Sequence, residues 1–212
     1  MARVTIVDYG LANLRSVVNA FEYFGAEVEL ARDGDALLKA ERIVLPGVGA
    51  FDAGMRGLRE RGHEEGLREA VLKRGIPYFG ICLGMQFLLQ GSEEGNEPGL
   101  SFLPGICGKF PEGAGQPKVP HIGWHDLVLN GKSRLFAGLV EAPDVYFVHS
   151  YFVPAEGETK DVATAFCDYG LRFTAALERD NIFACQFHPE KSQTAGMKMI
   201  ENFLQLQMAA AA

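Results

Sequence analysis

Through the first half of the chain, short apolar runs alternate with segments whose apolar residues recur every three or four positions. A short run predicts a buried strand, and the wider spacing predicts an amphipathic helix. In chain order the expected strands are 4–7, 27–30, 43–45 and 76–81. Helices are expected over 13–24, 33–39, 64–73 and 83–89. A further helix is expected after a glycine-rich turn at 46–49 and reaches residue 59. Strands that alternate with helices over short connections favour a parallel sheet covered by helices on both faces.

The second half of the chain has a different pattern. Residues 91–120 are rich in Gly and Pro and predict loops around one or two short strands. The segments 126–129, 145–153, 162–167, 173–178 and 182–187 predict strands with few helices between them, which indicates antiparallel strands added to the parallel core. A final helix over 194–207 places Met197, Ile200 and Phe203 on one face. With no internal repeat and no long linker, we expect one domain over 1–212.

Composition excludes several classes of protein. The formal charge is −7, and a protein that binds nucleic acid without sequence preference needs a cationic surface instead. The first residues contain no long apolar segment of a signal peptide, and no stretch approaches the length of a membrane span. The cysteines at 82, 107, 167 and 185 form no Cys-x-x-Cys pair, so we expect neither a metal site nor a disulfide scaffold. These observations favour a cytoplasmic protein with reduced thiols and no cofactor.

Cys82 has the setting of a catalytic nucleophile. It lies in "GICLGMQ", between an expected strand and an expected helix, with Gly80 and Gly84 on either side. Gly-x-Cys-x-Gly at such a junction is the cysteine form of a nucleophile elbow, in which larger side chains at the glycines would clash. The helix N-terminus favours a thiolate there, and the N–H of Leu83 is free to bind an oxyanion. The other cysteines lie in apolar strand-like runs and are expected in the core.

A thiol nucleophile needs a base, and His188 is the strongest candidate. It ends the apolar run 182–187 and is followed by Pro189 and Glu190. In extended backbone, residues i and i+2 face the same side, so Glu190 can orient the His188 ring. His63 lies among charged residues and is expected on the surface, while His121 and His125 flank Trp124 in an expected loop and His149 lies in a strand.

The turn Pro46-Gly47-Val48-Gly49 follows an expected strand and can reach the same edge of the sheet as Cys82. Its glycines allow unusual dihedral angles. We therefore expect the N–H of Val48 or Gly49 to face the oxyanion together with that of Leu83. Two orientations of this peptide would let a partner control the rate. The absence of a following Gly-Lys-Ser/Thr disfavours a phosphate-binding loop.

In this order, Pro-Gly-x-Gly, Gly-x-Cys-x-Gly-x-Gln and His-Pro-Glu resemble the pattern of the class I (triad-type) glutamine amidotransferases over nearly the whole chain. Within that family, "DYGLANLRSV", "LPGVGAF", "VPHIGWH", "YFVHSY" and "QFHPEKS" resemble the glutaminase subunits of imidazole glycerol phosphate synthase. Two positions depart from that pattern, since Ala12 replaces a usual Gly and His125 a usual Asn. The resemblance implies a flavodoxin-like three-layer sandwich with added antiparallel strands.

The resemblance also implies an activity and its residues. Cys82, His188 and Glu190 would form the catalytic triad that hydrolyses glutamine to glutamate and ammonia through a thioester. The residues that would surround the bound glutamine are Gly49, Gln86, Glu94, Ser150 and Tyr151.

A partner is implied as well. The ammonia would enter a (β/α)₈-barrel cyclase subunit, where imidazole glycerol phosphate and an aminoimidazole carboxamide ribotide form during histidine biosynthesis. The positions that match the family at or near this heterodimer interface are Asn13, Arg15, Pro120, His121, Ile122, Gly123, Trp124 and Lys191.

Three alternatives remain open from the sequence. The chain could be the glutaminase of another synthase, such as those for anthranilate, guanylate or pyridoxal phosphate, although the first motif and the Trp124 segment disfavour this. It could be a cysteine hydrolase or peptidase on a related sheet, which would not need Gln86 or His-Pro-Glu. It could also be an inactive scaffold, which the intact triad disfavours.

Overall fold

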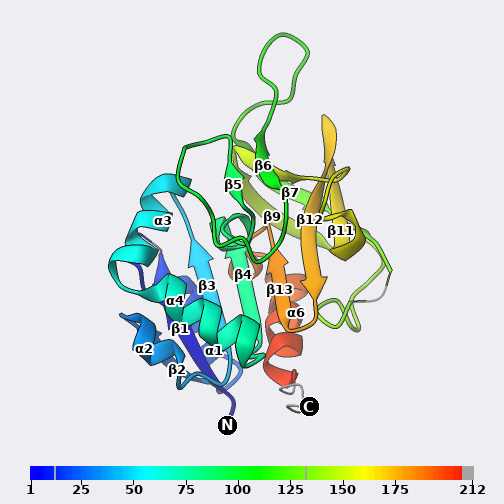
Figure 1. Ribbon diagram of the computed structural model, residues 1–212. Helices are drawn as coiled ribbons and strands as arrows, with labels where there is room; N and C mark the ends of the chain where they lie inside the picture. The colour runs from blue at the N-terminus through cyan, green and yellow to red at the C-terminus, as the bar shows by residue number, and fades with distance from the viewer. Residues whose placement is uncertain (12, 132, 207–212) are drawn as a thin grey trace.

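The computed structural model describes residues 1–11, 13–131 and 133–206, and Figure 1 shows their path. The strands in this part of the chain are β1 (Arg3–Val7), β2 (Glu27–Ala31), β3 (Ile43–Gly47), β4 (Tyr78–Cys82), β5 (Gly91–Ser92), β6 (Ile106–Lys109), β7 (His121–Asp126), β8 (Val128–Leu129), β9 (Asp144–His149), β10 (Tyr151–Pro154), β11 (Ala163–Tyr169), β12 (Leu171–Arg179) and β13 (Ile182–Cys185). The helices are α1 (Leu14–Glu22), α2 (Gly34–Leu37), α3 (Phe51–Glu60), α4 (His63–Leu67), the π-helix η1 (Arg68–Lys73), α5 (Leu83–Gln86), the 3₁₀ turns η2 (Lys160–Val162) and η3 (Pro189–Lys191), and α6 (Gln193–Gln205).

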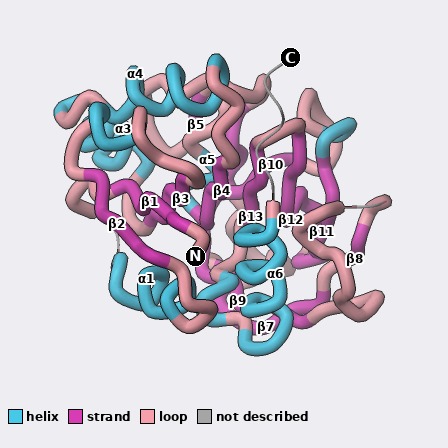
Figure 2. The backbone as a smooth tube through the Cα atoms, turned by 90° about the horizontal axis from the view of Figure 1, so that it is seen from below, coloured by secondary structure: helices cyan, strands magenta, loops and turns pink. Residues whose placement is uncertain are grey.

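Most strands join one mixed sheet in the order β2-β1-β3-β4-β13-β12-β10-β6-β5, with β11 added on β12 and β8 on β11. The half from β2 to β13 is parallel, and β12 begins the antiparallel part. A separate antiparallel pair, β7 and β9, lies below the main sheet together with α1 and α6, while α3 and α4 cover the opposite face (Figure 2). This arrangement confirms the expected mostly parallel core with added antiparallel strands.

Alternating side chains of the central strands supply two hydrophobic cores. Val44 and Ile81 face the core beneath α1 and α6, whereas Ile43, Leu45 and Tyr78 face the core beneath α3, α4 and α5. A strand buried on both faces is apolar without interruption, which is why these segments read as continuous apolar runs in the sequence. The carboxyl ends of β3, β4 and β13 therefore meet at one edge, between two well-packed layers.

The expected segment 145–153 is two strands rather than one. β9 ends at His149 because it pairs with β7, and the chain then turns at Ser150 so that Tyr151 pairs with Lys109 of β6. The expected loop around Trp124 was likewise wrong, since 121–126 pairs residue for residue with β9 as strand β7. Both errors come from cross-strand pairing, which local sequence does not reveal.

Other expected elements differ at their ends. The helix expected over 83–89 stops at Gln86, and Pro46 and Gly47 belong to the end of β3 rather than to a free turn. The expectation that His63 lies on the surface was wrong, because its side chain is fully buried where α4 packs against α2. Its Nε2–H donates to the carbonyl of Asp8 at 3.2 Å, which supplies one polar partner inside the core.

Candidate active site

Cys82 lies at a sharp turn between β4 and α5. Its backbone has φ 55° and ψ −108°, a sparsely populated conformation for a residue with a side chain. The two flanking glycines permit this turn: a Cβ at Gly80 would lie 2.6 Å from the carbonyl oxygen of Gly84, and one at Gly84 would lie 1.8 Å from that of Leu45. The expected steric reason for the Gly-x-Cys-x-Gly spacing is therefore confirmed.

Two side-chain amides, those of Gln86 and Gln186, form a hydrogen-bonded chain that ends at the Cys82 sulfur. Gln186, fully buried, donates from Nε2 to Cys82 Sγ at 3.6 Å, and its Oε1 accepts from Gln86 Nε2 at 3.0 Å. Gln86 also donates to the carbonyl of Tyr151 at 3.0 Å, so its amide nitrogen is occupied by the protein itself. Sequence reasoning missed Gln186, although the residue lies in the quoted "QFHPEKS" stretch two positions before His188.

His188 and Glu190 form a buried pair just after the end of β13. His188 Nδ1 lies 2.8 Å from Glu190 Oε1, and both side chains are 4% exposed. The backbone route differs from the expected one, because only His188 is extended while Pro189–Lys191 form a 3₁₀ turn. Two hydrogen bonds fix the main chain of His188. Its N–H donates to the carbonyl of Tyr146, and the Ser192 hydroxyl donates to the carbonyl of His188.

The charges around the His188 ring favour its protonated form. Burial lowers the pKa of His188, but a thiolate at Cys82 and the carboxylate of Glu190 outweigh it and raise the pKa to about 10. Nε2 is buried and has no hydrogen-bond partner among the described residues. With Nδ1 directed at Glu190, Nε2 is the ring nitrogen that is left available for proton transfer.

A cavity of about 270 Å³ opens above the Cys82 sulfur. All five residues expected around a substrate line it. The full lining is Val48, Gly49, Cys82, Leu83, Gln86, Glu94, Pro120, Val148, His149, Ser150 and Tyr151. A larger hollow of about 590 Å³ lies beside α2 and α4, and its lining includes none of these residues.

The expected oxyanion donors border the same cavity. Leu83 begins α5 directly after Cys82, and Gly49 has φ +96°, a conformation that glycine adopts without strain. Val48 also lines a smaller adjoining hollow, whose walls include Asn13, His188 and Lys191. The Val48 peptide thus lies between the cavity at Cys82 and a second set of polar side chains, two of which were expected near a partner.

His149, which lines the cavity, forms a buried pair with His121. His149 Nδ1–H donates to the carbonyl of Tyr151 at 2.8 Å, so its Nε2 accepts from His121 Nδ1–H at 3.0 Å. His121 is stacked on Tyr169, with ring centroids 3.9 Å apart. Burial lowers the pKa of His121 to about 3 and that of His149 to about 4, and both rings are therefore neutral at pH 7.

The residues expected at a partner interface divide into two groups. Ile122 and Trp124 on β7 are 56% and 40% exposed, and the Trp124 ring contacts Tyr146, over which Lys191 also lies. Asn13, Arg15 and Lys191 are exposed as well, and Gly123 is partly so. The expectation that His121 lies at the interface was wrong. Its side chain is fully buried against the aromatic core under β7 and offers no surface to a partner.

Pro120 lines the cavity at Cys82. Of the two departures from the family pattern, His125 is half-buried with its ring centroid 4.7 Å from that of His121, and Ala12 lies outside the described residues.

Among the residues that the structure describes, no helix combines the length and apolar character needed to cross a membrane, and no group of three or more His, Cys, Asp or Glu side chains is arranged to hold a metal ion.

Comparison with known proteins gives concordant results. The family model "Glutamine amidotransferase class-I" matches residues 5–206. The chain is 45% identical to the imidazole glycerol phosphate synthase subunit HisH of Geobacter sulfurreducens, covering 96% of this chain and 98% of that one. It is 46% identical to the HisH subunit of Salinibacter ruber, with 95% and 94% covered.

Two solved structures resemble this chain in fold. A crystal structure described as a glutamine amidotransferase matches with a TM-score of 0.73 at 21% identity, covering 95% of this chain and 97% of that one. The structure of PurLQS from Thermotoga maritima matches with a TM-score of 0.68 at 21% identity, covering 96% and 98%. Sequence and fold agree: this chain belongs to the class I glutamine amidotransferases and, within them, to the HisH family of imidazole glycerol phosphate synthase subunits.

Proposed function

We propose that this chain hydrolyses glutamine to glutamate and ammonia at Cys82 and delivers the ammonia to a (β/α)₈-barrel cyclase subunit. The observation that carries the proposal is the buried His188–Glu190 pair, which follows β13 where that strand pairs with β4 just before Cys82, together with a cavity of about 270 Å³ at Cys82. Membership of the HisH family gives the pathway, L-histidine biosynthesis, and the kind of partner.

In the first half of the reaction, the Cys82 thiolate attacks the side-chain amide carbon of glutamine. The negative charge that develops on the amide oxygen is stabilised by the N–H of Leu83 and by that of Val48 or Gly49. The protonated His188 ring gives its Nε2 proton to the departing nitrogen, so that the C–N bond breaks and ammonia leaves. The products of this half are ammonia and a thioester on Cys82.

In the second half, neutral His188 takes a proton from water, and the hydroxide attacks the thioester carbonyl. Collapse of this second tetrahedral intermediate breaks the C–S bond and releases glutamate. The thiolate and the protonated ring are thereby restored, and Glu190 holds the ring in one orientation throughout. The net reaction consumes one glutamine and one water and yields one glutamate and one ammonia.

The cavity walls have groups suited to an amino acid. Glu94 provides a carboxylate for the α-ammonium of glutamine, while Gly49, Ser150 and Tyr151 provide main-chain and side-chain polar groups. Gln86 acts mainly by supporting Gln186 and Tyr151, since its amide nitrogen is already hydrogen-bonded to them.

The proposed partner surface contains Ile122, Trp124, Asn13, Arg15 and Lys191. Exposed aromatic and aliphatic side chains bordered by polar ones are typical of a protein interface. Lys191 and Asn13 also border the Val48 loop, so a bound cyclase would contact the walls of the oxyanion site directly. That placement supports control of the glutaminase rate by the partner.

The test is ammonia release from glutamine, measured for the chain alone and with the cyclase subunit. We expect Cys82→Ala to abolish release, while Cys167→Ala, a matched change at another buried cysteine, leaves the rate within about twofold. The Cys82→Ala complex should still make imidazole glycerol phosphate from free ammonia, because the chemistry in the cyclase does not need the thiol. An unchanged rate of glutamine hydrolysis in Cys82→Ala would contradict the proposal.

A further inference from the structure

The loop that carries Glu94 and the first turn of α3 hold each other through reciprocal hydrogen bonds. Glu94 Oε2 accepts from the N–H of Phe51, the first residue of α3, at 2.9 Å. In return, Asp52 Oδ2 accepts from the N–H of Asn96 at 3.1 Å, and its Oδ1 accepts from that of Glu97 at 2.9 Å. Helix-terminal N–H groups and loop N–H groups are thus both satisfied across one contact.

Gly95 is a further sign that this contact is built closely. A Cβ at that position would lie 1.9 Å from Asp52 Oδ1, so the carboxylate occupies the space that a side chain would fill. The same two N–H groups, of Glu97 and then Asn96, lower the pKa of Asp52, which keeps the carboxylate charged. The loop between Glu94 and Glu97 is therefore wrapped around a fixed anion.

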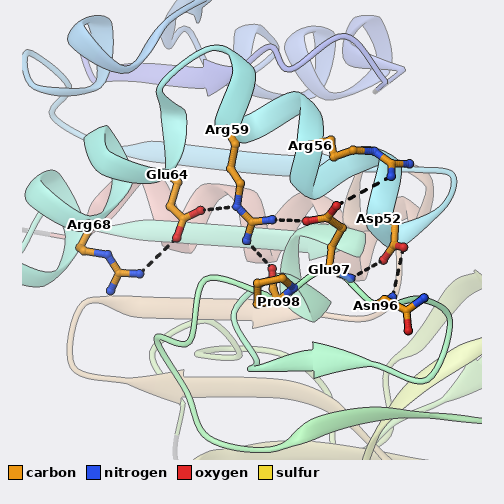
Figure 3. A network of polar contacts seen from close by, with 8 residues as sticks. All are labelled: Asp52, Arg56, Arg59, Glu64, Arg68, Asn96, Glu97 and Pro98. Atoms are coloured by element: carbon orange, nitrogen blue, oxygen red, sulfur yellow. Dashed lines mark hydrogen bonds and ion pairs between the residues drawn. The ribbon is translucent and has the colours of Figure 1, made fainter.

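Arg59, two turns further along α3, secures the far end of the loop. Its Nη1 donates to Glu97 Oε2 at 2.6 Å, its Nη2 to the carbonyl of Pro98 at 2.5 Å and its Nε to Glu64 Oε2 at 2.8 Å. Figure 3 shows this guanidinium at the centre of the network. Single surface ion pairs contribute little, but a half-buried arginine with three acceptors fixes a geometry well.

The contacts of Asp52 and Arg59 with residues 96–98, here called the clamp, hold the loop that carries Glu94. Glu94 is a wall of the cavity above Cys82, and Phe51, which holds its Oε2, follows Gly49 by two residues. The other oxygen, Oε1, accepts no hydrogen bond from the part of the chain that the structure describes. One oxygen is thus tied to the scaffold, and the second is left for a ligand.

We propose that Asp52 and Arg59 are positioning residues that place Glu94 to receive the α-ammonium of the substrate and so make the enzyme selective for amides that carry one. This inference rests on the proposed function, which assigns the cavity to glutamine. Neither residue touches the substrate, and both act through the Glu94 loop.

The experiment compares two substrates in the complex with the cyclase. Glutamine carries the α-ammonium, and glutaramate is the same amide without it. We expect Asp52→Asn and Arg59→Met to raise the KM for glutamine about tenfold, with kcat within about twofold and the KM for glutaramate unchanged. Arg68→Met is the matched control, because Arg68 donates to Glu64 and the carbonyl of Leu100 but not to the Glu94 loop, and it should change neither constant.

One further variant, Glu94→Gln, separates the possible outcomes. If Glu94→Gln raises the KM for glutamine selectively while the Asp52 and Arg59 variants do not, the clamp is wrong and the proposed function stands. If Glu94→Gln does not distinguish the two substrates, the role assigned to Glu94 is itself wrong. An equal loss with both substrates in the clamp variants would show general distortion of the cavity and overturn the inference. Should Asp52→Asn fail to fold, the Arg59→Met result decides.

Discussion

His188 Nδ1 and Glu190 Oε1 lie 2.8 Å apart, and the carboxylate is as deeply buried as the ring that it orients. The contact closes a short loop in the chain, because the 3₁₀ turn at Pro189–Lys191 brings a residue only two positions away back to the ring. The orientation of the base is thus set locally. Its position relative to Cys82 is set by the pairing of β13 with β4.

This contact predicts the behaviour of Glu190→Gln. Glutamine keeps the size of the side chain but removes the charge that favours the protonated ring, so we expect kcat for glutamine hydrolysis to fall by about 10²- to 10⁴-fold. Binding of glutamine should change much less, because Glu190 is not among the residues that line the cavity. The measurement is single-turnover ammonia release with an independent binding titration, and a wild-type kcat would contradict the role of Glu190.

The close contact of Gly84 with the carbonyl of Leu45 predicts a large loss of stability in Gly84→Ala. The added Cβ would lie 1.8 Å from that oxygen, and neither backbone can move without disturbing β3 or the elbow. We expect a loss of about 3 kcal/mol in the free energy of unfolding by urea denaturation. Gly91→Ala is the control, since nothing lies within 4 Å of its added Cβ, and it should change stability by no more than about 0.5 kcal/mol.

Two buried tyrosines predict opposite effects for the same Tyr→Phe change. The Tyr78 hydroxyl donates to the carbonyl of Gly84 at 2.8 Å, so Tyr78→Phe should lose about 1 to 2 kcal/mol. The Tyr9 hydroxyl is buried with no hydrogen-bond partner among the described residues, so Tyr9→Phe should leave the free energy of unfolding unchanged or raise it. Thermal melts of both variants beside the wild type test the difference, and an equal loss in the two would show that the Tyr9 hydroxyl is satisfied.

The neutral buried histidines predict that stability falls as the solution is acidified below about pH 6.5. The folded-state pKa is lowered by burial for His63, His121 and His149, so the unfolded chain takes up protons first. His188 does not contribute in this range, because a raised pKa gives stability that is fully present below pH 6.5 and is lost only towards pH 10. Carboxylates whose pKa is lowered in the folded protein are still ionised between pH 6.5 and 5. The slope of the free energy of unfolding against pH in this range therefore reports the histidines.

The measurement for this prediction is the free energy of unfolding in urea from pH 8 to pH 5. His121→Phe should reduce the slope, since it removes one buried titrating ring and keeps an aromatic side chain next to Tyr169. A slope of zero in the wild type between pH 6.5 and 5 would contradict the neutral state of these rings.

Local sequence was sufficient where neighbouring residues decide the structure. Apolar runs gave the buried strands of the parallel half because those strands are covered on both faces, and the spacing of Gly80, Cys82 and Gly84 gave the elbow because steric space is a property of adjacent residues. The short His-Pro-Glu segment gave the contact of His188 with Glu190 for the same reason.

Only the tertiary structure decided which distant residues meet. The register of β13 against β4 sets Cys185 beside Ile81, which carries Gln186 to the sulfur of Cys82 across 104 positions of the chain. Packing of α4 on α2 buried His63, pairing with β9 made 121–126 a strand, and the Asp52 contact fixed the loop of Glu94. Such contacts depend on strand order and register, which are selected by the whole chain together rather than by any short segment of it.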